Sequence, residues 1–372
     1  MARLGDDDVR SVRASTFAVR LTVLLLAACA EAEDPAAAPV TGALEEVFAI
    51  EAVLQLGEDP ADSIAEIGSF AERRGGGYVV GDLFLPRVRS YDEEGRLEAA
   101  FGRFGDGPFE FRRINALAET SSEDIVVVDL LRARLTFLTG SLAPVTFETL
   151  PGALYDARPL GPDLLLRMMA AAPEDRLRGH PALLHRMTVP ELELVWSSYE
   201  RPFSDFERPY WGAFARFPVA VGGDSTFVMS GLEYPVTIIG DAGEIAGTLG
   251  TPSASFRPIP VLELGAFANP AAYGTTLGEF LGTFDVIDRI DAVGRHLVLT
   301  RARFDPGRPM PPFRVLHTSL EVYDRHTGTK LYEDVPLPDG SRVLGGGRFL
   351  YLLLDRDFPP WQIAKLRLLT ED

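Results

Sequence analysis

The chain has 372 residues, of which 46% are hydrophobic and 24% are charged, the ordinary balance of a globular protein. Its 54 acidic residues outnumber the 36 basic residues, and the formal net charge is −18, with no basic cluster in the sequence. Nucleic-acid binding requires positive charge that neutralises phosphates. The composition therefore excludes nucleic acid as an expected partner.

An apolar run near the N-terminus indicates export. Residues 21–28 read LTVLLLAA and follow Arg10, Arg13 and Arg20. The run is too short to span a bilayer as a helix, but it suits the apolar region of a signal peptide. Cys29, the only cysteine, follows at once, and residues 26–29 resemble a lipobox. We expect residues 1–28 to be a signal peptide and Cys29 to carry a lipid; the alternative is a buried cysteine after a plain secretory signal.

The next stretch has the composition of a tether. Residues 30–42 are rich in alanine, proline and acidic residues and have no apolar period. We expect residues 29–43 to be a disordered, lipid-anchored tether, so that the membrane is contacted only through the lipid. Ala30 is not an aspartate, and by resemblance to Gram-negative lipoproteins this favours the outer membrane. Residues 44–372 are expected to form one domain.

The rest of the sequence consists of short runs of β-forming residues separated by turn residues, and this pattern predicts an all-β fold. When the sequence is shifted by 47 residues, residues 78–82 (YVVGD) align with residues 125–129 (IVVVD). When it is shifted by 148 residues, residues 79–80 align with residues 227–228. A period in the forties with four short strands per unit is typical of a β-propeller, because one small sheet must stack on its neighbours to bury both faces. Two stacked β-sandwich domains are the alternative.

Weaker copies of the unit bring the count to six. These copies are residues 163–166 with 182–187, 296–299 with 320–324, and 348–354 with 362–366. The last unit lacks an outer strand, and residues 48–56 can supply it. We therefore predict a single six-bladed propeller closed by an N-terminal strand. A short helix over residues 44–56 is the alternative, because their apolar residues also fit a helical face in part.

One linker carries a family resemblance. Residues 102–111 read GRFGDGPFEF and follow a strand and a turn. They resemble the G-x-G-P-G-E-F linker of bacterial six-bladed propeller lipoproteins related to NHL-repeat proteins, and the likeness is good over residues 64–150. Phe109 stands where that family has its last glycine, so we expect the linker backbone to differ there. The resemblance implies a central channel with ligands at one mouth.

The related propeller families also suggest a second function. They include calcium-dependent lactonases and paraoxonases, which set carboxylates and asparagines around a metal at the channel mouth. By that resemblance the alternative function is a metal-dependent hydrolase or lyase with calcium as its cofactor, whereas a binding module needs no cofactor. The candidate ligands before the valine-rich runs are Glu66, Asn115, Asp156 and Asp285, with Asp288 and Asp291 close to the last. Carboxylates in such positions also cap turns or bond neighbouring blades.

Other aspartates recur with the repeat. Asp82 and Asp129 stand just past the second strand of their units, where we expect each carboxylate to accept backbone N–H bonds in the turn to the third strand. Asp92 and Asp324 each lead a tight turn closed by a glycine. The sequence contains no G-x-S-x-G or H-E-x-x-H motif.

Insertions in the repeat are the better candidates for function, because loops on a rigid scaffold carry most binding sites. They span residues 173–181, 199–217 and 267–284. The aromatic residues expected to bind a partner are Tyr199, Phe203, Phe206, Tyr210 and Trp211. The same aromatic segment could be a lid packed on the propeller. We predict an envelope-anchored binding or scaffolding module for an envelope protein, peptide or glycan, without catalytic residues.

Overall fold

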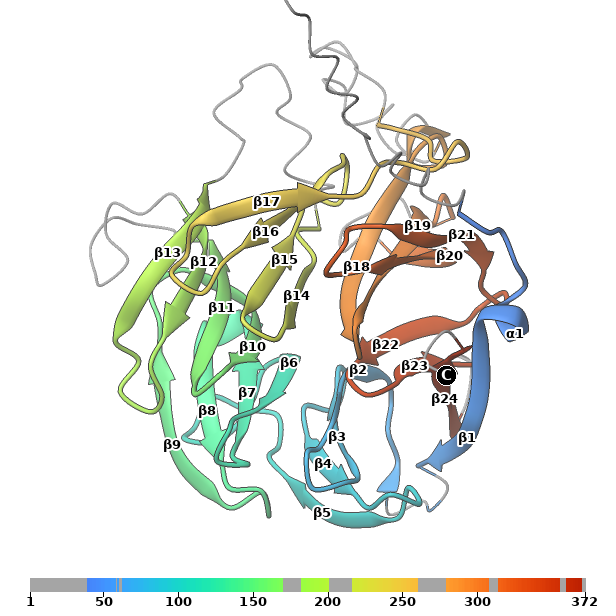
Figure 1. The fold of residues 1–372 in the computed structure, drawn as a ribbon. Coiled ribbons are helices and arrows are strands. Elements are labelled where there is room, and N and C mark those ends of the chain that lie inside the picture. The colour runs from blue at the N-terminus through green and yellow to red at the C-terminus, as the bar shows by residue number, and fades with distance from the viewer. Residues whose placement is uncertain are drawn as a thin grey trace, which may run out of the picture. The chain divides into compact units, whose positions relative to one another are not determined.

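The strands of this chain form a ring of small sheets. The computed structural model describes residues 39–57, 59, 62–169, 182–200, 216–259, 279–307, 314–354 and 359–369. All of them belong to one unit, Ala38–Asp372. Within the described residues the strands form six antiparallel sheets of four strands each, arranged around a common centre (Figure 1). The predicted all-β, six-bladed propeller is therefore confirmed, and the stacked-sandwich alternative is not.

The blades follow one another along the chain, and the sixth combines its two ends. Blade 1 contains β2 (Ile67–Glu72), β3 (Tyr78–Asp82), β4 (Val88–Tyr91) and β5 (Leu97–Phe101). Blade 2 contains β6 (Ile114–Glu119), β7 (Ile125–Asp129), the 3-10 helix η2 (Leu130–Arg132), β8 (Arg134–Leu138) and β9 (Pro144–Thr149). Blade 3 contains β10 (Ala153–Leu160), β11 (Asp163–Met169), β12 (Ala182–Met187) and β13 (Leu194–Glu200).

The second half of the ring has the same layout. Blade 4 contains β14 (Val219–Gly222), β15 (Ser225–Val228), β16 (Val236–Ile239) and β17 (Ile245–Leu249). Blade 5 contains β18 (Asp285–Val293), β19 (His296–Phe304), β20 (Val315–Asp324) and β21 (Lys330–Pro336). Blade 6 contains β22 (Arg342–Gly346), β23 (Leu350–Leu353), β24 (Trp361–Leu368) and β1 (Phe48–Leu56), which follows the short helix α1 (Leu44–Val47).

The first strand of each blade lies at the centre of the ring and the last lies at its rim (Figure 1). The four strands of a blade alternate in direction, so each blade ends at the same end of the central channel at which it began. All six inner strands therefore begin at that end. We call this end the linker face, because the interblade linkers and the loops between second and third strands lie there. The opposite end, with the other hairpins, is the turn face.

The N-terminal strand closes the ring as predicted. β1 pairs antiparallel with β24, from Phe48 opposite Leu368 to Leu56 opposite Trp361. The helical alternative holds only for the four residues of α1. Ahead of α1, Val40 forms a parallel bridge with Tyr332 on the rim strand β21. Residues from both ends of the described chain thus complete the last two blades.

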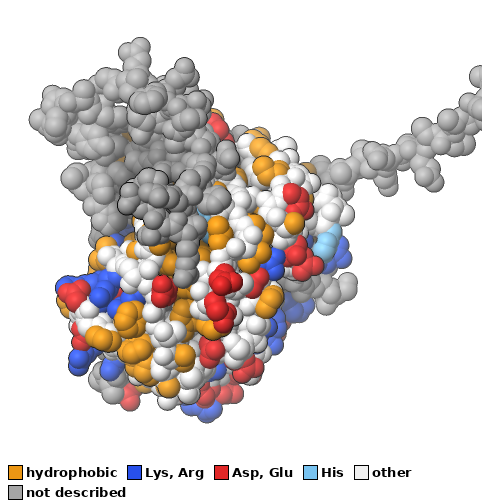
Figure 2. Space-filling view, turned by 90° about the vertical axis from the view of Figure 1, so that its left-hand side faces the viewer, with side chains coloured by type: hydrophobic (Ala, Val, Ile, Leu, Met, Phe, Trp, Pro, Cys, Tyr) orange, Lys and Arg blue, Asp and Glu red, His pale blue; other side chains and the backbone are white. Residues whose placement is uncertain are grey.

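Burial explains why the second strands are the clearest in the sequence. All five residues of β3 and all five of β7 are buried. These strands lie in mid-blade and pack against a neighbouring blade on each face, so they are continuous apolar runs. The rim strand β9, in contrast, is exposed along its whole length. Figure 2 shows that flank of the ring, where hydrophobic side chains are interspersed with charged ones.

β-Bulges recur in the inner strands. Register shifts occur between Ile67 and Ser69, Ile114 and Ala116, Leu154 and Asp156, Ile287 and Arg289, and Val343 and Gly345. Each shift adds one residue to the strand facing the channel, and bulges bend a strand and redirect its side chains. Asn115 and Asp288 are such added residues. The directions of these two side chains therefore depend on the bulges and not on simple alternation.

Buried aspartates and arginines clamp the linkers of the first two blades. Asp82 accepts hydrogen bonds from the backbone N–H groups of Phe84 and Leu85, each at 3.0 Å, as predicted, and from the N–H of Ala65 in the preceding linker at 2.8 Å. The prediction is wrong for Asp129, which makes no bond in its own turn and instead accepts from Arg112 at 2.8 Å. Its turn is replaced by η2, so the carboxylate is free to hold the linker.

Arginines complete these clamps from the third strands. The Arg89 guanidinium donates to the carbonyl of Ser63, and that of Arg134 donates to the carbonyls of Gly107 and Glu110. Both arginine side chains are buried. Buried donors that lose a partner are costly, so each linker is tied to its blade from two strands.

The linker of blade 2 differs from expectation at Phe109. Its φ is 57°, in the left-handed region that glycine favours. The backbone therefore keeps a glycine-like conformation despite the larger side chain. The ring packs edge-on against Phe147, with centroids 5.6 Å apart, and against Phe101 at 6.4 Å. These contacts offset the strain of about 1–2 kcal/mol expected for a side chain in this region.

Candidate functional site

Most of the residues predicted to bind a partner lie outside the described residues. These are Phe203, Phe206, Tyr210 and Trp211, and Cys29 also lies outside them. Tyr199, at the end of β13, is described. Its ring lies 6.5 Å from that of Phe217 and packs on the core between blades 3 and 4. Burial raises the pKa of Tyr199 to about 12, as expected for a side chain packed into the propeller.

The four predicted metal ligands do not converge. Among the described residues, no three histidine, cysteine, aspartate or glutamate side chains form a group that could hold a metal ion. The Asn115 amide donates to the carbonyl of Tyr155 in the next blade. Glu66 lies 3.6 Å from Arg342, and Asp156 lies 3.1 Å from Arg158. Each of these groups bonds neighbouring protein groups, so the donor set does not fit calcium.

Asp285 is the fourth of these residues, and it lies fully buried at the start of β18. Its carboxylate accepts bonds from Arg303 Nε at 2.7 Å and from the backbone and side chain of Arg257 at 2.9 and 3.1 Å. Burial alone would raise the pKa of Asp285, but the hydrogen bonds from Arg303 and Arg257 outweigh it and lower the pKa. The carboxylate therefore anchors the strand.

A histidine and an aspartate meet near the channel, in a geometry that needs a defined tautomer. His317 Nδ1 accepts a bond from the backbone N–H of Val343 at 3.0 Å, so the ring proton lies on Nε2, 3.1 Å from Asp288. Burial would raise the pKa of Asp288, but its bond from His317 and the charge of Arg216 hold it well below the ordinary range. With both ring nitrogens engaged, His317 is not placed to accept a proton from a substrate.

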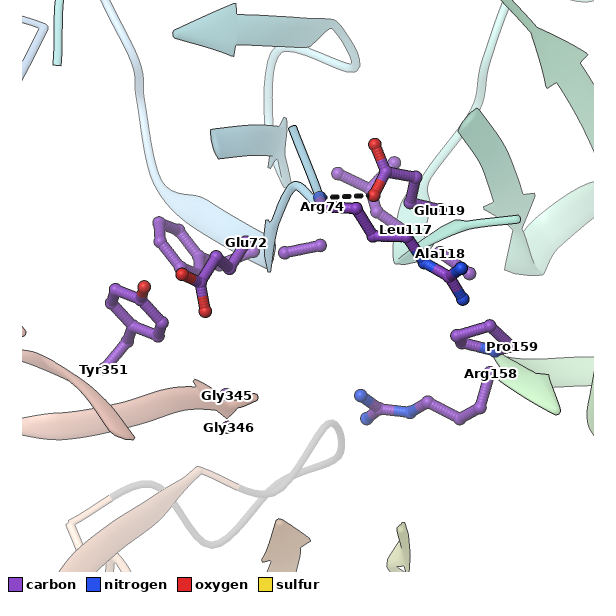
Figure 3. Close-up of a pocket in the computed structure, with 12 residues that line it drawn as sticks. Glu72, Arg74, Leu117, Ala118, Glu119, Arg158, Pro159, Gly345, Gly346 and Tyr351 are labelled. Carbon is purple, nitrogen blue, oxygen red and sulfur yellow. Dashed lines mark hydrogen bonds between the residues drawn. The ribbon is translucent and has the colours of Figure 1, made fainter. Parts of the chain in front are cut away.

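A pocket opens at the other end of the channel, on the turn face (Figure 3). Its volume is about 150 Å³, and the ends of β2, β6, β10 and β22 line it. Charged residues at its wall are Glu72, Arg74, Glu119 and Arg158. This pocket was not among the sites predicted from the sequence. A signal was present, because Glu72 and Glu119 are separated by the same shift of 47 that relates the first two blades.

The linker face carries exposed apolar side chains over blades 1 and 2. Phe84, Leu85, Phe104 and Leu131 are each more than half exposed. They lie on the β3–β4 loop, the linker from β5 to β6, and η2, which all meet this face. The Arg112 guanidinium lies 4.6 Å over the ring of Phe104. We call these four apolar residues and their neighbouring arginines the aromatic–arginine surface.

The charge of this surface is opposite to that of the whole chain. Its three loops, residues 83–87, 102–113 and 130–133, contain five arginines against Asp106 and Glu110, a net charge of +3 from five minus two. Arg87 is exposed and Arg103 is 81% exposed. The whole chain has a net charge of −18. This local reversal does not appear as a run of consecutive basic residues, because the five arginines come from three separate loops.

Comparisons with known proteins show the fold. No protein-family model matches the chain, and no curated protein matches it. A solved structure of a protein described as exported, from Bacteroides fragilis, is similar with a TM-score of 0.62 and 13% identity, over 89% of this chain and 98% of that one. A member of the DUF4221 family from Bacteroides vulgatus has a TM-score of 0.55 and 12% identity, over 86% and 98%. At such identities the similarity establishes the propeller alone.

A third solved structure, virginiamycin B lyase from Staphylococcus aureus, has a TM-score of 0.47 and 14% identity, over 87% of this chain and 100% of that one. Within the described residues, no helix is long and apolar enough to cross a membrane.

Proposed function

We propose that the chain is an exported, lipid-anchored binding module that holds an acidic protein partner on its linker face. The observation that carries this proposal is the aromatic–arginine surface over blades 1 and 2. A metal-dependent hydrolase or lyase is less well supported, because the side chains of Asp285 and His317 already bond protein groups that hold the blades.

The composition of the surface supports protein binding. Interface cores are enriched in aromatic residues and arginine, and a few such residues supply most of the binding free energy. Phe84 is 67% exposed and Phe104 is 62% exposed. Large apolar groups that remain exposed on a rigid scaffold are typical of a contact surface.

The arginines define the chemistry of the partner. In the part of the chain that the structure describes, no carboxylate lies within ion-pair distance of Arg87, and Arg132 donates to the carbonyl of Gly107. Complementary charge speeds encounter and selects partners. The partner is therefore a protein segment that combines acidic and apolar side chains.

The test compares variants of matched exposure. Purified protein is cross-linked in an envelope extract, and each captured protein is then purified and its affinity measured directly. We expect binding to an acidic partner to be lost when Phe84 and Leu85 are both replaced by serine. Charge reversal by Arg87→Glu should slow association and weaken its salt dependence.

The control is Ile245→Ser, since Ile245 is 67% exposed but lies on the rim strand of blade 4. It should leave the affinity unchanged. Equal affinity of the wild-type protein and the Phe84/Leu85 variant for every captured protein would contradict the proposal, and so would the capture of no protein by the wild type.

The lipid anchor has a separate test. The lipobox-like residues 26–29 and the absence of any other cysteine support lipidation of Cys29, and a similar structure is described as an exported protein. In cells fed a labelled fatty acid, the wild-type protein should carry label and fractionate with the outer membrane. Cys29→Ala should carry none. Undiminished label on Cys29→Ala, with Cys29→Ser compared in parallel, would contradict the anchor.

A further inference from the structure

We propose that the pocket on the turn face binds a small carboxylate, held by Arg74 and Arg158. The ligand is a free monocarboxylic acid or the C-terminal residue of a peptide, two sources that share the same chemistry. The pocket lies at the opposite end of the channel from the aromatic–arginine surface, so this site is independent of the proposed protein contact.

Two guanidinium groups from different blades reach this opening. Arg74 extends from the β2–β3 turn past Ala118 toward Pro159, and Arg158 extends from β10 toward Gly345 and Gly346 (Figure 3). Arg158 uses Nε to bond Asp156 at 3.1 Å, which leaves its terminal nitrogens as donors, and its side chain is 30% exposed. Two planar guanidinium groups at the mouth of one pocket can each donate two hydrogen bonds to a planar carboxylate.

The negative charge of each wall carboxylate is offset by an arginine other than Arg74 and Arg158. Glu72 accepts two bonds from Arg348, at 2.9 and 2.7 Å. Glu119 accepts from the backbone N–H of Arg74 at 2.6 Å and lies 3.6 Å from Arg73 Nε. Among the described residues, no carboxylate lies within ion-pair distance of the Arg74 guanidinium. This guanidinium therefore remains for a ligand.

The size and the apolar part of the wall define the rest of the ligand. A cavity of about 150 Å³ holds a molecule the size of benzene, about six non-hydrogen atoms. Ala71, Leu117, Ala118 and Pro159 supply apolar contact. A carboxylate with a short alkyl group fills this space. An inorganic phosphate would leave the apolar wall unused.

Titration of the folded protein by nuclear magnetic resonance and calorimetry tests the site. The probes are propionate, the tripeptide Gly-Gly-Ala, their uncharged amides propionamide and Gly-Gly-Ala-amide, and inorganic phosphate. We expect saturable binding of propionate, the tripeptide or both, and no binding of the amides. Which acid binds more tightly identifies the source of the carboxylate. The Kd should rise about tenfold or more in Arg158→Gln and in Arg74→Gln, the loss expected for a charged hydrogen bond.

Controls separate binding from folding. Arg96→Gln changes an arginine on the turn face that is 75% exposed and paired with Asp92 and Glu94, and it should leave the Kd unchanged. Arg158→Lys keeps the charge beside Asp156 and should restore part of the affinity. The proposal is overturned if no carboxylate binds saturably, if the amides bind equally well, if phosphate binds more tightly than both acids, or if folded Arg74→Gln and Arg158→Gln bind as the wild type does.

Discussion

Blade 1 and blade 6 have the same four-stranded layout but are assembled in different ways. Blade 1 is one continuous stretch, β2 to β5, and Asp82 and Arg89 bind its incoming linker from within the blade. Blade 6 takes β1 from the N-terminal part of the chain and β22–β24 from the C-terminal part. The first blade is therefore specified by nearby residues, whereas the last depends on a pairing across the whole domain.

Blade 6 is also held differently by its neighbours. Trp361 donates from Nε1 to the carbonyl of Ile64 in the linker of blade 1, at 3.0 Å, and Arg348 pairs with Glu72. On the other side, the N–H of Val343 donates to His317 of blade 5. These bonds reach into both adjacent blades. Ring closure should therefore be the most sensitive point of the fold.

The largest effect is expected from removing β1. A chain that begins at Gly57 loses Phe48, Leu54 and Leu56, which are all buried. Burial of three such side chains contributes roughly 5–9 kcal/mol, comparable to the whole stability of a typical domain, and β24 would become an open edge. We expect this chain to aggregate or to unfold at a sharply lower temperature, as measured by thermal unfolding.

The matched control is a chain that begins at Gly42. It keeps β1 but loses Val40, which makes two backbone hydrogen bonds with β21, at 3.1 and 3.2 Å. Val40 is 56% exposed, so the loss should be about 1–2 kcal/mol at most. Equal unfolding midpoints for the chains beginning at Gly57 and Gly42 would show that β1 does not hold the ring closed.

Much of the architecture could be predicted because the repeat is local. The shift by 148 that matched blade 1 to blade 4 also placed Gly95 on Gly243, and both lie in tight turns with φ of 84° and 86°. A side chain at either position would be strained, so a glycine at this place in the repeat predicts the tight turn. Closure by residues 48–56 followed from the missing outer strand of the last unit.

The site could be predicted only in part, because it depends on tertiary detail. The bulge at Asn115 directs its amide to a carbonyl of the next blade, and no sequence pattern reports a bulge of this kind. Asp285 is bonded by Arg257 and by Arg303. These two arginines lie on a linker and on another strand, so no local pattern brings them to Asp285. The +3 charge over blades 1 and 2 is built from three separate loops.

The second and smaller effect concerns the charge of Asp288 on β18 of blade 5. Asp288 accepts the His317 bond and lies 3.4 Å from Arg216, and its pKa is held below the ordinary value of 3.8. A carboxyl with a lowered pKa in the folded chain stabilises it at pH values above 3.8. That contribution is lost as the pH falls below 3.8 toward the folded value.

Asp288→Asn should therefore unfold more easily than the wild type at pH 7, by on the order of 2 kcal/mol, because the charge opposite Arg216 is removed. The difference should shrink at about pH 3, where the wild-type carboxyl loses its advantage. Urea unfolding at both pH values measures this. Asp92→Asn is the control in blade 1: its partner Arg96 is 75% exposed, and exposed pairs contribute little, so its stability should match the wild type at pH 7. A difference between Asp288→Asn and the wild type that does not change with pH would show that Asp288 acts through packing and not through its charge.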